Sequence, residues 1–250
     1  MISLKTASEI EAIARAGAII GRLFEHVPEW IRPGVTTADL DRATEAFILD
    51  HPPAIPAFKG LYGFPASACI SVNQEVVHGI PSPRRVLKEG DIVSVDVGVR
   101  LEGWYADAAR TFAVGEIDPA ARRLLDVTEA ALHEGISRAL PGNRIGDIGH
   151  AIQRSVERAG YTVVRDLVGH GVGRGPHEEP QVPNFGRPHQ GLRLRSGLVI
   201  AIEPMVNEGG PEVRTLEDRW TVVTADRKRS AHFEHTVAVL DDGPRILTLP

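Results

Sequence analysis

The chain has 250 residues, of which 42% are hydrophobic and 24% are charged, and its formal net charge is -5. This length is enough to bury a substantial core. The scattered Lys and Arg exclude the basic patch that binding to nucleic acid or an anionic membrane requires. The single cysteine, Cys69, excludes an internal disulfide. Because no apolar leader or membrane-spanning run is present, we expect a cytoplasmic protein without membrane attachment.

The first fifty residues predict two helices. From about Ser8 to Glu29, apolar residues recur at intervals of three and four, and Ser8 is placed to cap the start. Pro33-Gly34 then breaks the chain. A second helix is expected from Thr37 to about Leu49, because Pro52-Pro53 stops it.

The next segments read as strands. Ala68–Val72 and the start at Val76-Val77-His78 precede a β-branched run, Asp91–Val99, that carries Asp96 in its middle. Asp107 follows beyond a Gly-Trp-Tyr segment that reads as the far side of a hairpin. An ionised carboxylate in such an apolar run costs several kcal/mol unless it is paired, protonated or bound to a metal.

The second half begins with helices again. A strand through Phe112-Ala113-Val114 ends at Gly115, and Asp118-Pro119 opens a helix that we expect to reach about Leu140. Ile145 to Ala159 is helical in pattern. The remainder alternates Gly/Pro loops with short apolar runs, which are Thr162–Val164, Leu198–Ile202, Trp220–Val223 and Thr236–Val239.

Two pairs of segments repeat at an offset of about 107 or 108 residues. The segment 33–43 echoes 141–151, and 87–96 echoes 194–203 in the same order. The repeat predicts two related halves, each of helices followed by a sheet segment. Because neither half could leave its sheet face exposed to water, we expect one shared core and a single α+β domain over residues 1–250.

The repeat also aligns four carboxylates. Glu203 is equivalent to Asp96, and Glu234 precedes a strand as Asp107 does. Four carboxylates that converge in an apolar sheet repel one another without cations, and they suit two divalent ions. A nearby histidine favours Mn, Fe, Co or Zn over calcium. The candidate histidines are His78 and, in the glycine-rich loop 169–180, His170 and His177.

Other interpretations of these residues are weaker. A single acid in a strand is usually in a salt bridge or at a solvent edge, but four equivalent acids in a repeat are not explained that way. The glycines near His170 lack the Gly-Lys-Ser/Thr of a phosphate loop. Ser71 lacks the context of a nucleophile elbow, and no activating pattern surrounds Cys69.

Taken together, these segments resemble the type I methionine aminopeptidases over nearly the whole chain. The matching segments are 63–73, 78–81, Asp96 with Asp107, 169–174, 177–180, 203–204 and 233–236. The resemblance implies the pita-bread fold, in which two pseudo-symmetric halves form an antiparallel sheet covered by helices. That fold agrees with the repeat.

The resemblance also implies a dinuclear metal site and a mechanism. The implied metal ligands are Asp96, Asp107, His170, Glu203 and Glu234. Two divalent ions would hold a water or hydroxide that attacks the scissile carbonyl. Glu203 would act as general base and acid, while His78 and His177 would bind the substrate and stabilise the oxyanion.

The resemblance places an apolar pocket for the methionine side chain. Its implied residues are Phe58, Leu61, Phe64, Cys69, Pro176 and Trp220. The chain departs from the family pattern at Leu61 and Phe64, where tyrosines are usual, at Pro176, where an aromatic residue is frequent, and at Arg219, where glycine is usual.

His232 is a further departure, since glutamine is usual there. Period-two alternation puts His232 on the same strand face as Glu234. We therefore expect its imidazole to hydrogen-bond a metal ligand or water.

The implied activity is removal of the N-terminal (initiator) methionine from nascent proteins and peptides with a small second residue. We expect a monomer, and transient ribosome association fits this role. One alternative is an Xaa-Pro peptidase of the same fold, although such proteins usually carry an extra N-terminal domain. Another is a non-catalytic pita-bread binding protein, although these tend to lose metal ligands and all five positions are filled here.

Overall fold

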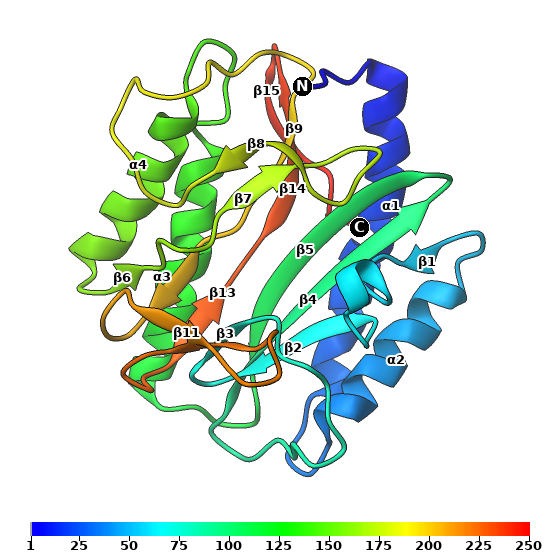
Figure 1. The fold of residues 1–250 in the computed structure, drawn as a ribbon, viewed down its shortest axis with the longest axis vertical. Helices are drawn as coiled ribbons and strands as arrows, with labels where there is room; N and C mark the ends of the chain where they lie inside the picture. Colours follow the sequence, from blue (N-terminus) through cyan, green and yellow to red (C-terminus); the bar gives the residue numbers. More distant parts are fainter. Residues whose placement is uncertain (1) are drawn as a thin grey trace.

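Figure 1 shows the computed structural model, which describes residues 2–250. Two helices, α1 (Ala7–Trp30) and α2 (Thr37–Leu49), lie on one side of the strands, and α3 (Pro119–Ile136) and α4 (Ile145–Arg158) lie on the other. Each half therefore contributes one pair of helices, as the repeat predicts.

The first half is built around a long hairpin. Strand β4 (Ile92–Leu101) pairs along its length with β5 (Trp104–Ala113), and its other edge pairs with β2 (Ala68–Val72) and β1 (Ile55–Pro56). Buried side chains of α1 pack on this sheet with Val93, Val95 and Val97. A short 3-10 turn, η1 (Leu61–Gly63), lies between β1 and β2.

The second half contains a five-stranded sheet in the order β15-β14-β9-β7-β8. Its strands are β7 (Gly169–Gly171), β8 (Glu178–Val182), β9 (Val199–Ile202), β14 (His235–Leu240) and β15 (Gly243–Ile246). Two small three-stranded sheets complete the fold. They are β13 (Ser230–His232), β10 (Met205–Asn207) and β6 (Thr162–Val163), and β11 (Val213–Thr215), β12 (Val222–Thr224) and β3 (Glu75–Val77).

Matching hydrogen bonds support the repeat. The Gly34 N–H donates to Leu87 O at 2.9 Å, and the Gly142 N–H donates to Leu194 O at 3.0 Å. The antiparallel bridge between Thr36 and Val86 is matched by one between Arg144 and Arg193. Each half therefore fastens the start of its second helix to the turn before its central strand in the same way.

The two halves are joined along β5. The Glu234 N–H donates to Ala109 O at 2.9 Å, and the Asp107 N–H donates to the Thr236 hydroxyl at 3.1 Å. These bonds link the last strand of the first half to the chain that enters β14. Acidic residues from both halves therefore meet at this seam.

The structure corrects three sequence predictions. Thr6, not Ser8, caps α1. The Thr6 hydroxyl accepts the Glu9 N–H while the Glu9 carboxylate accepts the Thr6 N–H, which forms a capping box, and Ser8 already lies inside the helix. Helix α3 ends at Ile136 rather than near Leu140. At its end the Ser137 hydroxyl donates to Glu134 O at 2.7 Å. The segment 169–180 is not a loop throughout, because β7 and β8 flank its turn.

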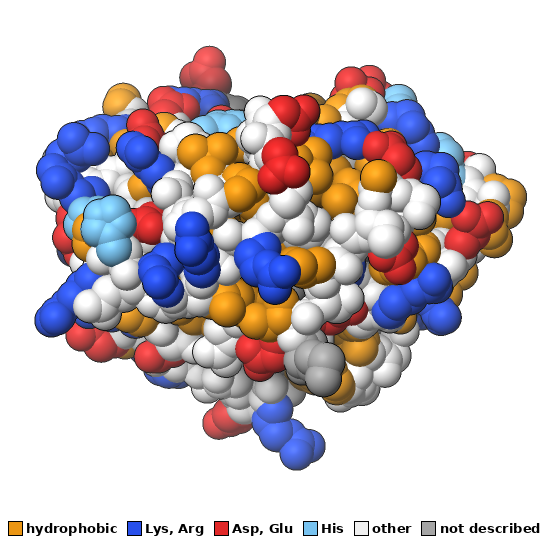
Figure 2. All heavy atoms as spheres, turned by 90° about the horizontal axis from the view of Figure 1, so that it is seen from above, with side chains coloured by type: hydrophobic (Ala, Val, Ile, Leu, Met, Phe, Trp, Pro, Cys, Tyr) orange, Lys and Arg blue, Asp and Glu red, His pale blue; other side chains and the backbone are white. Residues whose placement is uncertain are grey.

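Surface charge on the face in Figure 2 is mixed. Basic and acidic side chains are interspersed there, with hydrophobic side chains between them. In the described part of the chain, residues 2–250, every helix is too short or too polar to span a bilayer.

Candidate metal centre

Strand register places Asp96 and Asp107 on one face. In the β4–β5 hairpin Gly98 pairs with Asp107 and Asp96 pairs with Ala109. Since side chains alternate along a strand, Asp96 and Gly98 share a face with Asp107, and the two carboxylates are diagonal neighbours. A Cβ on Gly98 would lie 2.6 Å from the Phe58 ring, so the glycine leaves room for that ring beside the carboxylates.

The second half supplies the remaining groups from three segments. His170 is the middle residue of β7, Glu203 directly follows β9, and Glu234 lies between β13 and β14. The Asn184 side-chain amide donates to Glu203 O at 3.0 Å and holds that backbone where the strand ends. Glycines flank His170 because a Cβ at Gly169 or Gly171 would meet a neighbouring carbonyl oxygen at 2.3 Å.

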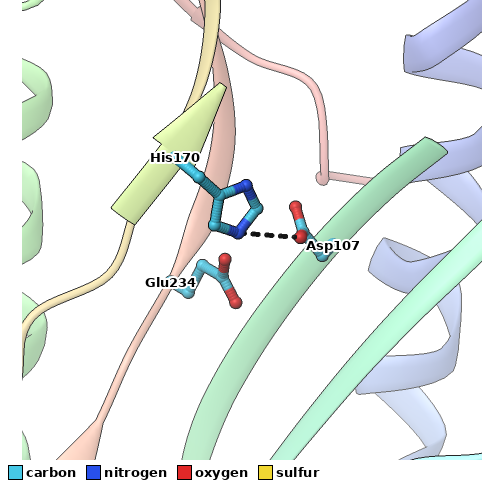
Figure 3. Close-up of side chains that lie close together, drawn as sticks. All are labelled: Asp107, His170 and Glu234. Carbon is cyan, nitrogen blue, oxygen red and sulfur yellow. Dashed lines mark ion pairs between the residues drawn. The ribbon is translucent and has the colours of Figure 1, made fainter. Parts of the chain in front are cut away.

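These side chains converge. Ligand atoms of Asp107, His170 and Glu234 all lie within 4.8 Å of one another (Figure 3). His170 Nε2 is 3.4 Å from Asp107 Oδ2 and 3.6 Å from Glu203 Oε1. The structure thus brings a histidine and at least three carboxylates together from strands far apart in the sequence.

Burial and neighbouring charge raise the pKa of three of these carboxyl groups, those of Asp96, Glu203 and Glu234. Burial, and then the charge of Asp107, raises the pKa of Asp96 well above its usual range. Burial and the neighbouring carboxylates act in the same direction on the pKa of Glu203 and of Glu234. Among residues 2–250, no lysine or arginine lines this cavity, so protein cations do not balance the cluster. A cluster of this kind requires protons or metal ions.

The donor set fits a divalent metal. Asp96 Oδ1 is buried and has no hydrogen-bond partner within the described chain. His170 Nδ1 lies 3.0 Å from Gly171 O and must donate to it, which leaves the Nε2 lone pair facing the carboxylates. The Thr236 hydroxyl, 2.9 Å from Asp107 Oδ1, orients that carboxylate. Oxygen and imidazole donors, with the His170 ring and the Asp107 carboxylate oriented by neighbouring groups, are typical of a transition-metal site.

A cavity of about 310 Å³ adjoins the cluster. All five predicted ligands line it, as do His78 and His177, so the structure brings the predicted polar residues into one site. Five of the six residues predicted for the apolar pocket also line the cavity, namely Phe58, Leu61, Phe64, Cys69 and Trp220. Pro176 lies in the turn between β7 and β8 and is not among the lining residues.

His78 and His177 are neutral bases beside the acidic end of the cavity. Burial, and then the charge of His177, lowers the pKa of His78. Burial, and then the charge of His170, lowers the pKa of His177. His78 has a φ of 58°, a left-handed conformation that few non-glycine residues adopt and that is often found at functional sites.

Sequence analysis missed five lining residues, which are Tyr62, Val77, Leu167, Val168 and Met205. Tyr62 is 75% exposed at a φ of 50°, and its ring is nearly parallel to that of His177, with centroids 6.1 Å apart. The family-like segment 63–73 indicated that this part of the chain contributes to the site. The resemblance assigned Leu61 and Phe64 to the pocket but not Tyr62, which lies between them in the sequence. Met205 could have been found from its place two residues after Glu203.

His232 is buried beside the cluster. Its Nε2 atom has no hydrogen-bond partner among the described residues, and Glu203 Oε2 is 3.7 Å away, too far for a hydrogen bond. The expected hydrogen bond to a ligand is therefore not formed at this distance. Burial, and then the charge of His78, lowers the pKa of His232 to about 3, so its imidazole is neutral at neutral pH.

Comparison with known proteins gives consistent matches. The model of metallopeptidase family M24 matches residues 11–241. A methionine aminopeptidase from Clostridium perfringens is 56% identical over 249 residues, which cover 100% of this chain and 99% of that protein.

Solved structures agree with this match. The crystal structure of a methionine aminopeptidase from Thermotoga maritima has a TM-score of 0.98 at 48% identity, with 100% of both chains covered. A prolidase from Pyrococcus furiosus shares the fold at a TM-score of 0.79 and 23% identity, over 99% of this chain and 65% of that one. These likenesses confirm the predicted α+β pita-bread fold.

Proposed function

The chain belongs to metallopeptidase family M24, and we propose that it is a metal-dependent aminopeptidase that removes N-terminal methionine from proteins and peptides. The observation that carries this proposal is the cluster of buried carboxylates and His170 at the end of an apolar cavity. Family and cluster together imply that the chain uses a divalent metal.

We infer that two ions of the Mn, Fe, Co or Zn type are held by Asp96, Asp107, His170, Glu203 and Glu234. When bound, such ions act as Lewis acids and make hydroxide available from water near neutral pH. Within that site, Glu203 accepts the proton of the attacking water and passes it to the leaving amine. A carboxylate beside the attacking water can take up that proton and release it again to the leaving amine.

His78 and His177 are the proposed donors to the substrate. As neutral imidazoles lining the cavity, each can place an N–H on the scissile carbonyl oxygen as negative charge develops there. The free α-amino group of the substrate would approach the metal that Asp96 would hold, and only a chain terminus offers such a group. This arrangement accounts for cleavage of a single terminal residue.

The apolar end of the cavity suits an unbranched thioether side chain. Phe64 and Trp220 meet edge to face with ring centroids 5.1 Å apart, and Cys69 lies in the same buried cluster. A flexible methionine side chain packs well against such rings. The proposed pocket does not include Pro176, which does not line the cavity, and it does include Tyr62, which does.

The experiment that tests the function compares two peptide classes with the metal-reconstituted protein. We expect release of methionine from Met-Ala-Ser peptides and slower or no release from peptides with a bulky second residue. Xaa-Pro peptides without N-terminal methionine should remain intact. Cleavage of the Xaa-Pro peptides alone would overturn the assignment in favour of the prolidase-like activity, and cleavage of neither would favour a binding protein.

A separate prediction concerns His232, the neighbour of Glu203. Its buried Nε2 atom has no partner among the described residues and lies 3.7 Å from Glu203 Oε2. We expect this atom to hydrogen-bond the Glu203 carboxylate when metal is bound and the two groups come closer. Replacing such a supporting group typically costs about 10–100-fold in metal affinity or activity. We expect His232→Leu to weaken metal binding by about tenfold in titration calorimetry and His232→Gln to weaken it less. Unchanged metal-affinity and pH–rate profiles in His232→Gln would count against this role.

The proposed cellular role is removal of the initiator methionine from nascent chains in the cytoplasm, by a monomer that associates transiently with ribosomes. A small second residue is preferred in this proposal, as the resemblance to the methionine aminopeptidases implies.

A further inference from the structure

The turn that carries His177 is fastened from the opposite end of the chain. Lys5 Nζ lies 2.7 Å from Glu178 Oε2, although 173 residues separate the two. Only 4% of the Lys5 side chain is exposed. A nearly buried ammonium group must be paired, and among the described residues Glu178 is the carboxylate that pairs with it.

Glu178 closes the turn with its second oxygen. Its Oε1 atom accepts the Gly175 N–H at 3.0 Å, while Oε2 accepts from Lys5. Burial alone would raise the pKa of this carboxyl, but the hydrogen bonds from Lys5 and Gly175 outweigh it and hold the pKa below its usual value. Because His177 directly precedes Glu178, a carboxylate fixed on both oxygens also fixes the backbone that presents His177.

The backbone around Lys5 is shaped to admit it. A Cβ at Gly173 would lie 2.5 Å from Lys5 Cε and 2.6 Å from Glu178 Oε1. The Lys5 N–H donates to Gly197 O at 2.7 Å, just before the strand that leads to Glu203. Lys5 therefore contacts both the turn of His177 and the approach to Glu203.

We propose that Lys5 is a positioning residue that acts through Glu178 to hold the His177 imidazole over the metal centre. The inference rests on the proposed function insofar as His177 contributes to turnover. The geometry itself does not depend on that role. Without Lys5, Glu178 loses one of its two fixed bonds and the turn can shift relative to His170, whose ring centroid is 4.5 Å from that of His177.

The test is a double-mutant cycle on the metal-loaded protein. Lys5→Met keeps most of the apolar stem of the side chain and removes its charge. We expect kcat on a Met-Ala-Ser peptide to fall about tenfold with KM within about twofold, because a group that acts in the transition state is displaced. In a His177→Ala background, Lys5→Met should have no further effect on kcat. Additive losses would overturn the proposal, because they would show that Lys5 does not act through His177.

A spectroscopic measurement separates positioning from loss of activity. In ¹³C-histidine NMR spectra, Lys5→Met should shift the resonance that His177→Ala deletes and leave that of His133 in place. An unchanged His177 resonance would overturn the proposal. If His177→Ala alone left kcat unchanged, the role of His177 in the proposed function would fail, and the NMR result would still decide the positioning role.

Two further variants serve as an independent displacement of Lys5 and as a control. Gly173→Ala pushes Lys5 aside without altering its charge and should reproduce both effects, which covers the case in which Lys5→Met does not fold. Arg15→Met is the matched control, because it breaks the Arg15–Glu102 pair, in which both side chains are 57% exposed. The control should leave kcat and the NMR spectrum unchanged.

Discussion

Replacement of Glu203 by Gln or Ala should abolish hydrolysis, with a fall in kcat of about 10³-fold or more. Loss of a general base or acid typically costs about 10²–10⁴-fold, and Glu203 is also a proposed metal ligand. The fold should survive, because the Asn184 amide holds the Glu203 backbone and not its carboxylate. Single-turnover assays at saturating metal would separate the loss of proton transfer from the loss of metal.

Thermal unfolding provides the check on stability. Burial, then the charges of Asp96 and Asp107, raises the pKa of Glu203, so its ionised form destabilises the metal-free protein at neutral pH. Metal-free Glu203→Gln should therefore have a Tm no lower than that of the parent. Glu208→Gln is the matched control, since Glu208 pairs with Arg229 and does not line the cavity. Near-normal turnover in Glu203→Gln would contradict the mechanism.

Removal of divalent metal should abolish activity and lower Tm by an amount that grows with pH. In the metal-free protein the pKa values of Asp96, Glu203 and Glu234 are raised from the ordinary values of 3.8 for Asp and 4.5 for Glu. At a pH above those ordinary values, the folded state therefore binds more protons than the unfolded state. Stability of the metal-free protein is therefore lost as pH rises through that window. Metal replaces those protons, so its stabilising effect increases from pH 5 to pH 7.5.

Histidines act in the opposite direction but do not obscure this result. Burial is the main cause of the lowered pKa values of His78, His177, His232 and His235, so protonation below about pH 6.5 opposes folding. None of the four is a proposed ligand, so their contributions largely cancel in the difference between loaded and metal-free Tm. A metal-dependent Tm gain that stayed constant from pH 5 to pH 7.5 would argue against a carboxylate cluster.

Elements with strong local signals could be predicted from sequence. The predicted bounds of α2 and β2 agree with the structure. A Pro-Gly pair precedes α2 and a Pro-Pro pair follows it. Strand β2 is defined by a short apolar run that contains β-branched residues and is buried throughout. Strands β7 and β8 could not be predicted. Each contains residues with low β propensity, two glycines in β7 and Pro180 in β8, and pairing with β9 and with each other makes them strands.

The acidic part of the site was predictable because the repeat aligns it. In the sequence the repeat pairs Asp96 with Glu203 and Asp107 with Glu234, and in the structure all four carboxylates line the cavity. Tyr62 was not predictable, because its place at the cavity mouth depends on a left-handed φ in a short turn. The capping role of Thr6 was missed because only the contact with Glu9 distinguishes it from Ser8.

The matched hydrogen bonds at Gly34 and Gly142 also bear on how such a chain could arise. Each half alone offers an incomplete set of proposed ligands: Asp96 and Asp107 come from the first, and His170, Glu203 and Glu234 from the second. A polypeptide of half this length could complete a comparable set only as a homodimer, with the ions on its twofold axis. Duplication and fusion of such a gene would yield the present arrangement. Later divergence could then place the histidine and the two glutamates in one copy only.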